Sequence, residues 1–403
     1  MKNYLLLLLI AVLAVSCSKD NGEEEETDIY LYLSDTDILF ESTGGEDYFN
    51  ISCNSSWTVT NDVSWLQLEK NRGEGNARVK LTAIAGELSD DRNTVITVKS
   101  GATEESFTVI QEKTDRIITF NDIRFLNAII KHHPEADNNG DGKISEKEAS
   151  KVLTLNLSGM NVAEPEIRNM DELKHFTSLE YLNCYSHEIT SLDVSNNIKL
   201  TTLYCGANPI TSLDVSKNTA LTTLSCNDGA QLTSLDLSKN TALKYLNCNQ
   251  NKLTSLDLSK NVALEYLECW GCQLSSLDVS HNTALTNLWC GDNQLASLDI
   301  SKNTALTHLL CSSNPFTSLD LSKNTVLEDL NCISDKIIEL DLSNNKVLKK
   351  LVLHLYYNSS GGQVNNPNNT IKTLYLYKYH NLATSDISHI QKYCPNLTIT
   401  YAE

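Results

Sequence analysis

The chain has few basic residues to balance its acidic ones. Its 403 residues include 32 Lys and Arg against 51 Asp and Glu, which gives a formal charge of −19 at pH 7. Because an acidic protein repels phosphate backbones, this composition argues against nucleic acid as a partner. The excess of negative charge favours solubility and has no bearing on the fold.

Long apolar runs are also scarce. Residues 5–15 form one continuous apolar run after Lys2, with the length of a signal-peptide core and too short to span a bilayer. No second run reaches membrane-spanning length. We therefore expect a secretory signal over residues 1–16 and no transmembrane helix.

The sequence lacks a recognisable catalytic arrangement as well. No Ser/His/Asp or paired-carboxylate set stands out from the repetitive background. The neighbouring His132 and His133 are too sparse for a zinc site. We therefore expect no enzymatic activity and assign no catalytic residue.

The end of the apolar run resembles the cleavage box of bacterial lipoproteins. Ala14-Val15-Ser16 stand directly before Cys17, and the resemblance implies that Cys17 is the first mature residue and carries acyl chains that anchor it to a membrane. The acidic stretch that follows has no apolar periodicity, so residues 17–28 are expected to be the acylated Cys and a disordered tether. This stretch also resembles the surface-export signal of Bacteroides-type lipoproteins. The implied location is the outer membrane, exposed on the cell surface; a plain secretory signal and a plain linker are the alternatives.

Residues 29–113 are rich in β-forming residues. Short stretches such as 48–51, 77–81 and 106–110 are separated by glycine-containing breaks, which predicts an antiparallel sandwich. The detailed pattern resembles the BACON family of immunoglobulin-like modules, with matches at Ser56-Trp57, Val63-Ser64-Trp65-Leu66, Gly73-Glu74-Gly75, Arg92-Asn93-Thr94 and Val109-Ile110-Gln111-Glu112. That resemblance implies glycan or mucin binding, or a spacer. We expect Trp57 and Trp65 to be core residues, since a small sandwich needs large buried side chains.

Residues 114–151 change character and predict a helical cap with a calcium loop. Apolar residues at helical spacing over 120–130 predict one helix, and a second should begin near Ser145. Between them, residues 137–148 fit the EF-hand pattern D-x-[DN]-x-[DN]-G-x5-E in full.

The loop supplies the oxygen atoms that calcium requires. The expected ligands are the side chains of Asp137, Asn139 and Asp141, the carbonyl of Lys143, Ser145 through water, and both carboxylate oxygens of Glu148. Because the loop is single, we expect one structural Ca²⁺ rather than a sensor. The alternative is a polar loop that binds no metal.

A repeat of 21 or 22 residues dominates the rest of the chain. It is marked by cysteines at 184, 205, 226, 248, 269, 290, 311 and 332, and Leu353 takes the Cys place in a ninth turn. Each unit matches the leucine-rich-repeat template, which predicts a solenoid over residues 152–376 and a cap over 377–403. The cysteine-bearing unit resembles the internalin J-like repeats of the internalin family of listerial surface adhesins, which implies a binding role.

The repeated cysteines allow three interpretations. Disulfides suit an exported protein, clustered thiols can bind metal, and small apolar side chains can fill a core. Cys occupies a core position of the template, so we favour a buried column of free thiols. Cys269-Trp270-Gly271-Cys272 looks like a redox motif, but Cys272 stands in the Asn position of neighbouring repeats.

The residues flanking the strand Leu and Cys should point outward from the concave face. The repeats differ from one another most clearly at these outward positions. The predicted ligand-binding set is made of the outward aromatic and acidic residues Tyr181, Tyr185, Tyr204, Tyr245, Tyr266, Glu268, Trp270 and Trp289. Exposed Trp and Tyr anchor interfaces and stack on sugars. The alternative is that aromatics simply suit strands.

The sequence therefore predicts a mainly β protein, with an immunoglobulin-like sandwich, a short helical segment and a leucine-rich-repeat solenoid. We expect a non-catalytic surface lipoprotein that binds a protein or glycan through the concave face, as an adhesin does. The alternative is a lipoprotein that captures polysaccharide for a glycan-uptake system. The uniform Asp column of the repeats is expected to be structural.

Overall fold

The chain divides into two compact units, Met1–Thr114 and Asp115–Glu403. The computed structural model describes residues 28–158, 166–229, 231–332, 336–353, 355–357, 363–365, 371–377, 382, 387–388, 390 and 397–402. The expected signal segment, Cys17, the acidic tether up to residue 27 and much of the expected C-terminal cap lie outside those ranges. No helix in the described ranges is long and apolar enough to cross a membrane.

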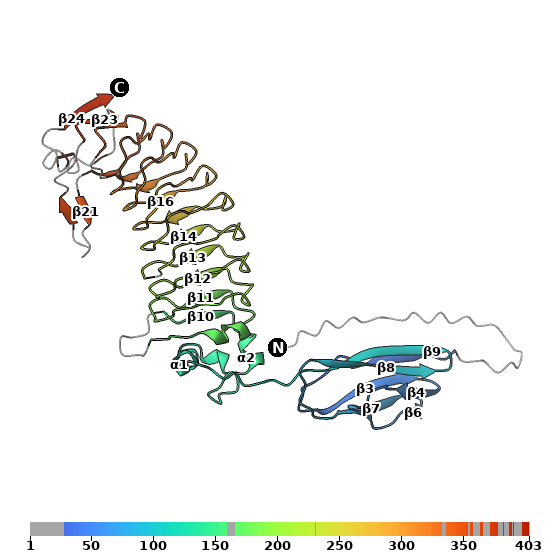
Figure 1. Cartoon of the computed structure of the whole chain (residues 1–403). Helices are drawn as coiled ribbons and strands as arrows, with labels where there is room; N and C mark the ends of the chain where they lie inside the picture. The colour runs from blue at the N-terminus through green and yellow to red at the C-terminus, as the bar shows by residue number, and fades with distance from the viewer. Residues whose placement is uncertain are drawn as a thin grey trace, which may run out of the picture. The chain divides into compact units, whose positions relative to one another are not determined.

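The first unit is a sandwich of two sheets (Figure 1). One sheet is antiparallel and holds β1 (Leu31–Ser34), β3 (Gly45–Cys53), β7 (Ala77–Ala83) and β5 (Leu66–Leu68) in that order. The other holds β2 (Ile38–Phe40), β9 (Thr103–Gln111), β8 (Arg92–Ser100), β4 (Ser56–Thr60) and β6 (Arg72–Glu74). All its neighbours are antiparallel except β2 and β9, which run parallel.

Period-2 alternation builds the core of this unit, because alternate side chains of a strand face one side of its sheet. Trp57 and Trp65 are both buried in it, as the sequence predicts. Trp57 pairs in register with Gly73, where any β-carbon would lie 2.3 Å from the indole ring, and its Nε1 donates to the carbonyl of Gly75 at 2.8 Å. The Gly73-Glu74-Gly75 segment therefore makes room for the Trp57 ring and accepts its hydrogen bond.

The second unit begins with a helical cap. It contains α1 (Ile123–His132), the 3₁₀ turns η1 (Pro134–Ala136) and η2 (Asp171–His175), and the one-turn α2 (Glu146–Ala149). α2 begins after Ser145, whose hydroxyl accepts from the N–H of Glu148 while the Glu148 carboxylate accepts from the N–H of Ser145. This capping box confirms a helix start at the expected residue.

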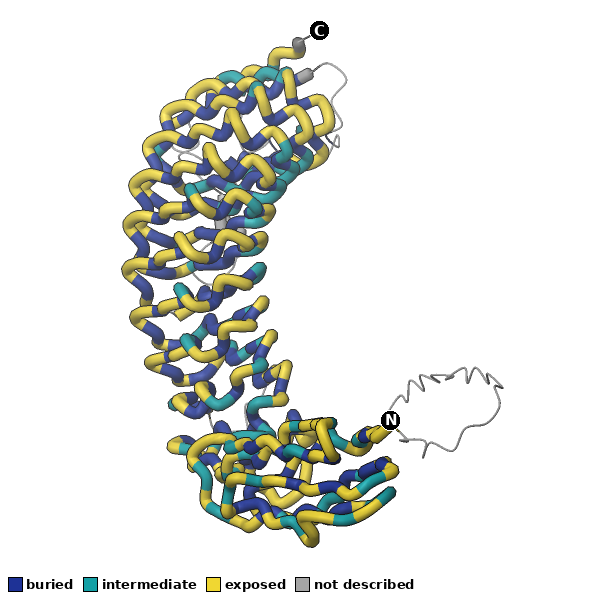
Figure 2. Tube along the Cα trace, turned by 90° about the vertical axis from the view of Figure 1, so that its right-hand side faces the viewer, coloured by how far each residue is buried: buried dark blue, intermediate teal, exposed yellow. Residues whose placement is uncertain are grey.

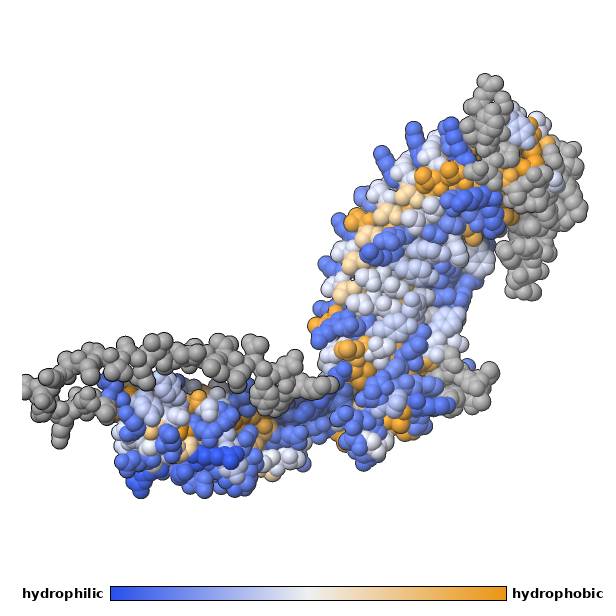
Figure 3. Space-filling view, turned by 180° about the vertical axis from the view of Figure 1, so that it is seen from behind, coloured by the Kyte–Doolittle hydropathy of each residue, from blue (hydrophilic) through white to orange (hydrophobic). Residues whose placement is uncertain are grey.

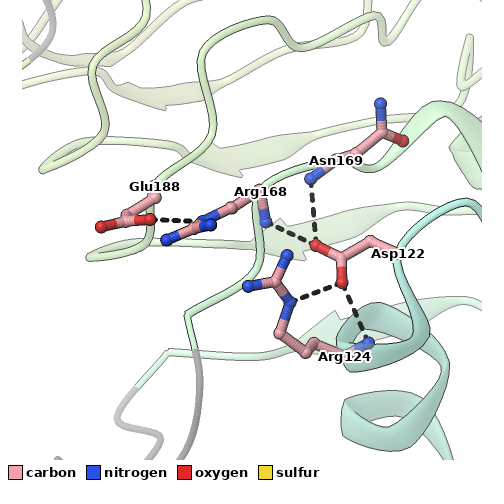
Figure 4. Close-up of polar contacts among 5 residues, drawn as sticks. All are labelled: Asp122, Arg124, Arg168, Asn169 and Glu188. Atoms are coloured by element: carbon pink, nitrogen blue, oxygen red, sulfur yellow. Dashed lines mark hydrogen bonds and ion pairs between the residues drawn. The ribbon is translucent and has the colours of Figure 1, made fainter.

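Asp122 fastens α1 to the solenoid (Figure 4). One carboxylate oxygen accepts from the backbone N–H and the Nε of Arg124 at 3.0 and 2.6 Å, and the other from the N–H groups of Arg168 and Asn169 at 2.7 and 3.3 Å. Arg168 in turn pairs with Glu188 at 2.5 Å. Burial raises the pKa of Asp122, but these hydrogen bonds outweigh it and hold the pKa below its usual value.

The repeats stack into one parallel sheet of ten short strands. In chain order these are β10 (Thr154–Asn156), β11 (Tyr181–Asn183), β12 (Thr202–Tyr204), β13 (Thr223–Ser225), β14 (Tyr245–Asn247), β15 (Tyr266–Glu268), β16 (Asn287–Trp289), β17 (His308–Leu310), β18 (Asp329–Asn331) and β20 (Lys350–Val352). Ten strands exceed the nine turns that the Cys and Leu353 alignment indicates. The extra strand, β10, precedes its neighbour by 27 residues and so falls outside the period, with buried Leu157 in the Cys place.

Buried residues recur in every turn along the inside of the stack (Figure 2). The central leucines of the ten strands are at most 3% exposed, and the eight cysteines at most 1%. Each turn covers the apolar stripe of the one before it, which is the stacking logic of a solenoid.

A column of buried asparagines ties the turns together. In each, the side-chain Nδ2 donates to two backbone carbonyls of the preceding turn at 2.8–3.1 Å. The column consists of Asn197, Asn218, Asn240, Asn261, Asn282, Asn303, Asn324 and Asn345. These carbonyls also accept backbone N–H groups within their own turn, so each asparagine adds a second donor to them and links two successive turns.

The far end of the solenoid uses a second sheet. β23 (Thr373–Tyr377) pairs in parallel with β19 (Glu339–Leu342) and β24 (Thr398–Ala402), rather than with β20. The strand at residues 373–377 therefore extends the Leu-Asp-Leu column of the repeat and not the Cys column. β21 (Leu355–Tyr357) and β22 (Gln363–Asn365) form a separate antiparallel pair.

Candidate ligand-binding surface

The ten-stranded sheet carries the outward side chains along the inner side of the curved stack (Figure 1). Within each three-residue strand the central Leu is buried and its two neighbours point to the other face. Parallel pairing without a register shift places equivalent residues beside one another on successive turns. Two columns of side chains, and a third just after the Cys, therefore run along this surface.

Three aromatic rings meet on β14, β15 and β16. The rings of Tyr245 and Tyr266 stack with centroids 5.0 Å apart and an interplanar angle of 24°. Tyr266 also contacts Trp289, with centroids 5.8 Å apart at 58°. We call Tyr245, Tyr266, Glu268, Trp270 and Trp289 the central cluster. The structure brings these five predicted residues together on three consecutive turns.

Glu268 stands at the middle of the central cluster. Its strand neighbours in register are Asn247 on one side and Trp289 on the other. One carboxylate oxygen accepts from the Tyr245 hydroxyl at 3.1 Å, and the other accepts from the amides of Asn247 and Asn249 at 3.0 and 2.8 Å.

Burial governs the ionisation of this group. Glu268 is only 7% exposed. Burial raises its pKa, while the hydrogen bonds from Tyr245 and Asn249 oppose that rise. Burial, together with the negative charge of Glu268, raises the pKa of Tyr245 to about 12. Tyr245 therefore stays protonated at neutral pH and can donate to the carboxylate.

Trp270 is the most exposed member of the central cluster, at 39%. Its backbone N–H donates to the side-chain oxygen of Asn249 at 2.6 Å. A β-carbon on Gly291, one turn later, would lie 2.8 Å from the indole. The glycine thus leaves room for Trp270 to lie across the next turn.

The remaining predicted residues form a smaller group, which β13 separates from the central cluster. Tyr181 and Tyr204 contact each other with centroids 6.0 Å apart, and the hydroxyl of Tyr185 donates to Asp228 at 3.3 Å. The short side chains of Thr223 and Ser225 on β13 stand between this group and the central cluster. The structure therefore divides the predicted surface into two groups.

Three polar residues join the candidate surface that were not in the predicted set. Asn247 and Asn249 hold Glu268, and Asp228 holds Tyr185 and accepts from Asn227 at 2.5 Å. Their columns mark them as outward-facing. Nothing in the sequence separates them from the other Asn and Asp residues, because their contacts are made between turns, directly across the strands for Asn247 and out of register for Asn249 and Asp228.

The Asp column is structural, as expected. At Asp193, Asp214, Asp236, Asp257, Asp278, Asp299, Asp320 and Asp341 the carboxylate accepts from the N–H of the Ser two residues later at 2.8–2.9 Å. These bonds close a side-chain turn in every repeat. They also lower the pKa of the first seven of these carboxyls.

The cysteine ladder consists of free, buried thiols. Burial raises the pKa of Cys184, Cys226, Cys290 and Cys332 to about 12. Thiols with such values stay protonated at neutral pH and are poor nucleophiles and metal ligands. The ladder is therefore core packing, the interpretation favoured from the sequence.

Cys272 contacts the preceding turn rather than Cys269. Its Sγ lies 3.3 Å from the carbonyl of Cys248. In other turns the equivalent Asn donates to the same carbonyl, as Asn251 does to Cys226 and Asn293 to Cys269. Gly271 has φ +66°. In most other turns the residue two places after the ladder cysteine also has positive φ, although it is not glycine there. The Cys-x-x-Cys run is thus a variant repeat turn.

The EF-hand-like loop is closed by its own backbone. Asp137 accepts from the N–H groups of Gly140, Asp141 and Gly142, and Asn139 and Asp141 each accept from the N–H two residues later. Gly140 and Gly142 have φ of +73° and +76°.

Glu148 folds back over this loop, and one of its oxygens accepts from the N–H of Asn138 at 2.9 Å. Within the described ranges, no three His, Cys, Asp or Glu side chains converge as a metal-binding group. Gly142, at the sixth place of the motif, has the positive φ that a sharp turn needs. Lys143 and Ser145 stand at the expected seventh and ninth places, so the residues fit a calcium loop.

Comparison with known proteins supports both architectures. Residues 55–112 match the family model BACON, described as a putative binding domain, N-terminal. The functional domain of InlJ from Listeria monocytogenes, which includes a cysteine ladder, is 34% identical with a TM-score of 0.51. That match covers 65% of this chain and 55% of the InlJ chain, so this protein spans little more than half of its relative.

Two further solved structures match at lower identity. The internalin InlF of Listeria monocytogenes strain 4b F2365 is 21% identical over 70% of this chain and 96% of its own, with a TM-score of 0.41. A leucine-rich-repeat protein of Leptospira interrogans is 16% identical over 58% and 81%, with a TM-score of 0.29. No curated protein sequence matches the chain. The chain combines a BACON domain with a leucine-rich-repeat solenoid that carries a cysteine ladder of the InlJ kind.

Proposed function

We propose that this protein is a non-catalytic binding protein that holds a protein or glycan ligand on the inner sheet face of its repeats. The observation that carries the proposal is the central cluster, where three aromatic rings and a buried carboxylate gather on three consecutive turns. Aromatic residues in a partly buried setting are the usual anchors of interfaces.

One unpaired group supports this surface. The indole N–H of Trp289 is buried and has no hydrogen-bond partner among the residues that the structure describes. Buried donors are nearly always paired, so an unpaired one favours an acceptor supplied from outside. The side-chain oxygens of the column asparagines also lack a partner within the described ranges, but those asparagines lie inside the stack, whereas Trp289 lies in an outward column on β16.

Capture from a panel tests the proposal. The protein beginning at Ser18, which keeps both units, would be applied to immobilised glycans, mucins and extracellular-matrix proteins. We expect at least one ligand whose binding is lost in the variant Tyr266→Ala/Trp289→Ala. Ligands that bind the variant and the parent protein equally would count against this surface.

A polysaccharide ligand is the second candidate. Stacked tyrosines and an exposed tryptophan can lie against sugar faces, and the BACON domain carries its own stacked and exposed pair, Tyr30 and Tyr32, with centroids 6.0 Å apart. In that case the protein would capture glycan for uptake by other proteins. Capture of glycans alone in the panel would favour it.

We also propose that the protein is a lipoprotein anchored through Cys17 on the outer membrane and exposed at the cell surface. The support is the sequence Ala14-Val15-Ser16-Cys17 and the acidic stretch that follows. A binding surface on an anchored protein would face ligands outside the cell. Loss of membrane association in Cys17→Ala would accord with this.

A single structural calcium ion in residues 137–148 completes the proposal. The loop is joined to the core: Ile144 is fully buried, its carbonyl accepts from the N–H of Ile118 at 2.8 Å, and Ser145 bridges to Ile117. Calcium, when bound, would neutralise the charge of Asp137, Asp141 and Glu148 and hold this end of the solenoid.

Calcium is therefore expected to raise the melting temperature and EGTA to lower it. If only the folded state binds calcium, a calcium concentration of 100 times the dissociation constant raises the free energy of unfolding by about 2.7 kcal/mol. Differential scanning calorimetry of the parent protein and Glu148→Gln measures the effect, and Asp257→Asn is the control for loss of one charge elsewhere. An identical melting temperature with calcium and with EGTA in the parent protein would exclude the metal.

A further inference from the structure

The central cluster holds a carboxylate without a cation. The donors to Glu268 that the structure gives are one hydroxyl and two amides, all neutral. A buried carboxylate is normally paired with Lys or Arg, because neutral donors only partly offset the loss of water. Three of the roughly four acceptor positions of the carboxylate are used, which leaves one on the oxygen that Tyr245 contacts.

The outward columns on either side of Glu268 also lack Lys and Arg. The two outward columns run from Thr154 and Asn156 to Asp329 and Asn331, and neither contains Lys or Arg over that length. The next residue of the first column, Lys350, already pairs with Asp329 at 3.1 Å. Lys244, which precedes Tyr245 in the chain, pairs with Glu265 at 3.1 Å.

Other carboxylates strengthen the same field. Asp228 lies two residues after the ladder cysteine Cys226. Its carboxylate accepts hydrogen bonds from the neutral Tyr185 hydroxyl and Asn227 amide. Asp292 has the same place two residues after Cys290. A protein face lined with negative charges attracts cationic groups of a ligand and repels anionic ones.

Aromatic rings border Glu268. Tyr266 lies on the same strand, Trp289 lies beside it in register on the next strand, and Trp270 follows it two residues on. The face of an aromatic ring attracts ammonium and guanidinium groups, and the attraction grows where water is excluded. Aromatic rings beside a carboxylate therefore favour a bound cation more than the rings or the carboxylate would alone.

We propose that the central cluster recognises a cationic side chain, an ammonium or guanidinium group presented by a basic segment of a protein partner. The charge lies over Glu268, and the aliphatic stem lies against Tyr266 and Trp289. Nucleic acid, sulfated glycans and uronate polymers are excluded by the same field. This inference rests on the proposed function and selects a protein over a glycan as the ligand.

The variant Glu268→Gln removes the charge and can keep the contacts. Its side-chain oxygen can accept from Asn247 and Asn249, while its amide nitrogen can donate to the hydroxyl of Tyr245, which reverses its role. Asp278→Asn is the matched control, because it removes one charge from the same repeat and its oxygen can still accept from the N–H of Ser280.

The probes are hexalysine, hexalysine with acetylated side chains, and a neutral gluco-oligosaccharide, each titrated into the protein at physiological salt. We expect hexalysine to bind, and Glu268→Gln to weaken it by about tenfold, as for loss of one partly desolvated cation partner. Asp278→Asn should change the affinity by less than about twofold, since exposed charges are screened. The acetylated peptide and the oligosaccharide should bind at least about tenfold more weakly than hexalysine.

Two results would overturn the inference. Equal weakening by Glu268→Gln and Asp278→Asn would mean that hexalysine senses only the net charge of −19. Binding of the oligosaccharide but not of hexalysine, with loss in Tyr266→Ala/Trp289→Ala, would refute the cationic ligand and leave the proposed binding surface intact.

Discussion

Replacing Asn197 with Ala is expected to lower the free energy of unfolding of the repeat unit by about 2–4 kcal/mol. Its side chain is fully buried, and its Nδ2 donates to the carbonyls of Leu173 and Phe176, both at 2.9 Å. The variant loses these two hydrogen bonds, worth about 0.5–1.5 kcal/mol each, while the two carbonyls keep the backbone N–H groups of Phe176 and Leu179. Ala also leaves a void where the carboxamide was.

The neighbouring Asn196 is the matched control. It has the same chemistry and stands next in the chain, but it is exposed. Asn196→Ala should change the free energy of unfolding by less than about 0.5 kcal/mol. Urea denaturation followed by circular dichroism measures both variants. Equal and small losses would mean that the asparagine column does not hold the turns together.

The sequence predicts the solenoid well because stacking is a local, periodic requirement. Each turn must bury its Leu and Cys against the next, so a period of 21 or 22 residues fixes the register of neighbouring strands. The same alternation tells which residues face outward. The core role of the cysteines, of Trp57 and of Trp65 follows from this logic and is confirmed.

Both ends of the solenoid lie within the predicted span, but the 21-residue period does not specify their strands. β10 has no Cys after it and lies 27 residues before β11, so the 21-residue period does not predict this strand. β23 continues the Leu-Asp-Leu column beside β19, although its Leu-Tyr-Leu pattern would also suit the Cys column. Which column a terminal strand extends depends on the length of the connection before it, and a short alternating pattern does not encode that.

The candidate surface was predictable in its columns but not in its contacts. Tyr245 reaches Glu268 diagonally from the previous turn, and Tyr266 meets Trp289 diagonally on the next. Such contacts depend on side-chain rotamers and on small neighbours such as Gly291. The neutral surroundings of Glu268, which suggest a cationic ligand, became visible only with those contacts in place.

Removing both indoles, Trp270→Ala with Trp289→Ala, is expected to abolish ligand binding while the fold is kept. Trp270 is exposed, and Trp289 is only partly buried, so neither fills the core between turns. Seen from behind, most of the repeat unit presents hydrophilic or near-neutral side chains, with hydrophobic ones near the C-terminal turns and again at the opposite end of the stack (Figure 3). Interface anchors lose about 2 kcal/mol or more each when truncated to Ala. The double variant should therefore bind at least about 100-fold more weakly.

The matched control lies in the first unit. Tyr30 and Tyr32 are also exposed and stacked, so Tyr30→Ala with Tyr32→Ala removes a comparable aromatic pair from the BACON domain. If the solenoid is the binding surface, this variant keeps the affinity of the parent protein. An unchanged circular dichroism spectrum in both double variants establishes that the fold is retained.

The dissociation constant of a ligand captured from the panel, measured for the parent protein and these two double variants, tests the central claim most directly. We predict at least about a 100-fold increase for Trp270→Ala/Trp289→Ala and no change for Tyr30→Ala/Tyr32→Ala. The reverse pattern would place binding in the BACON domain. An unchanged constant in both variants would place binding away from both aromatic pairs, and either result would contradict binding by the inner face of the repeats.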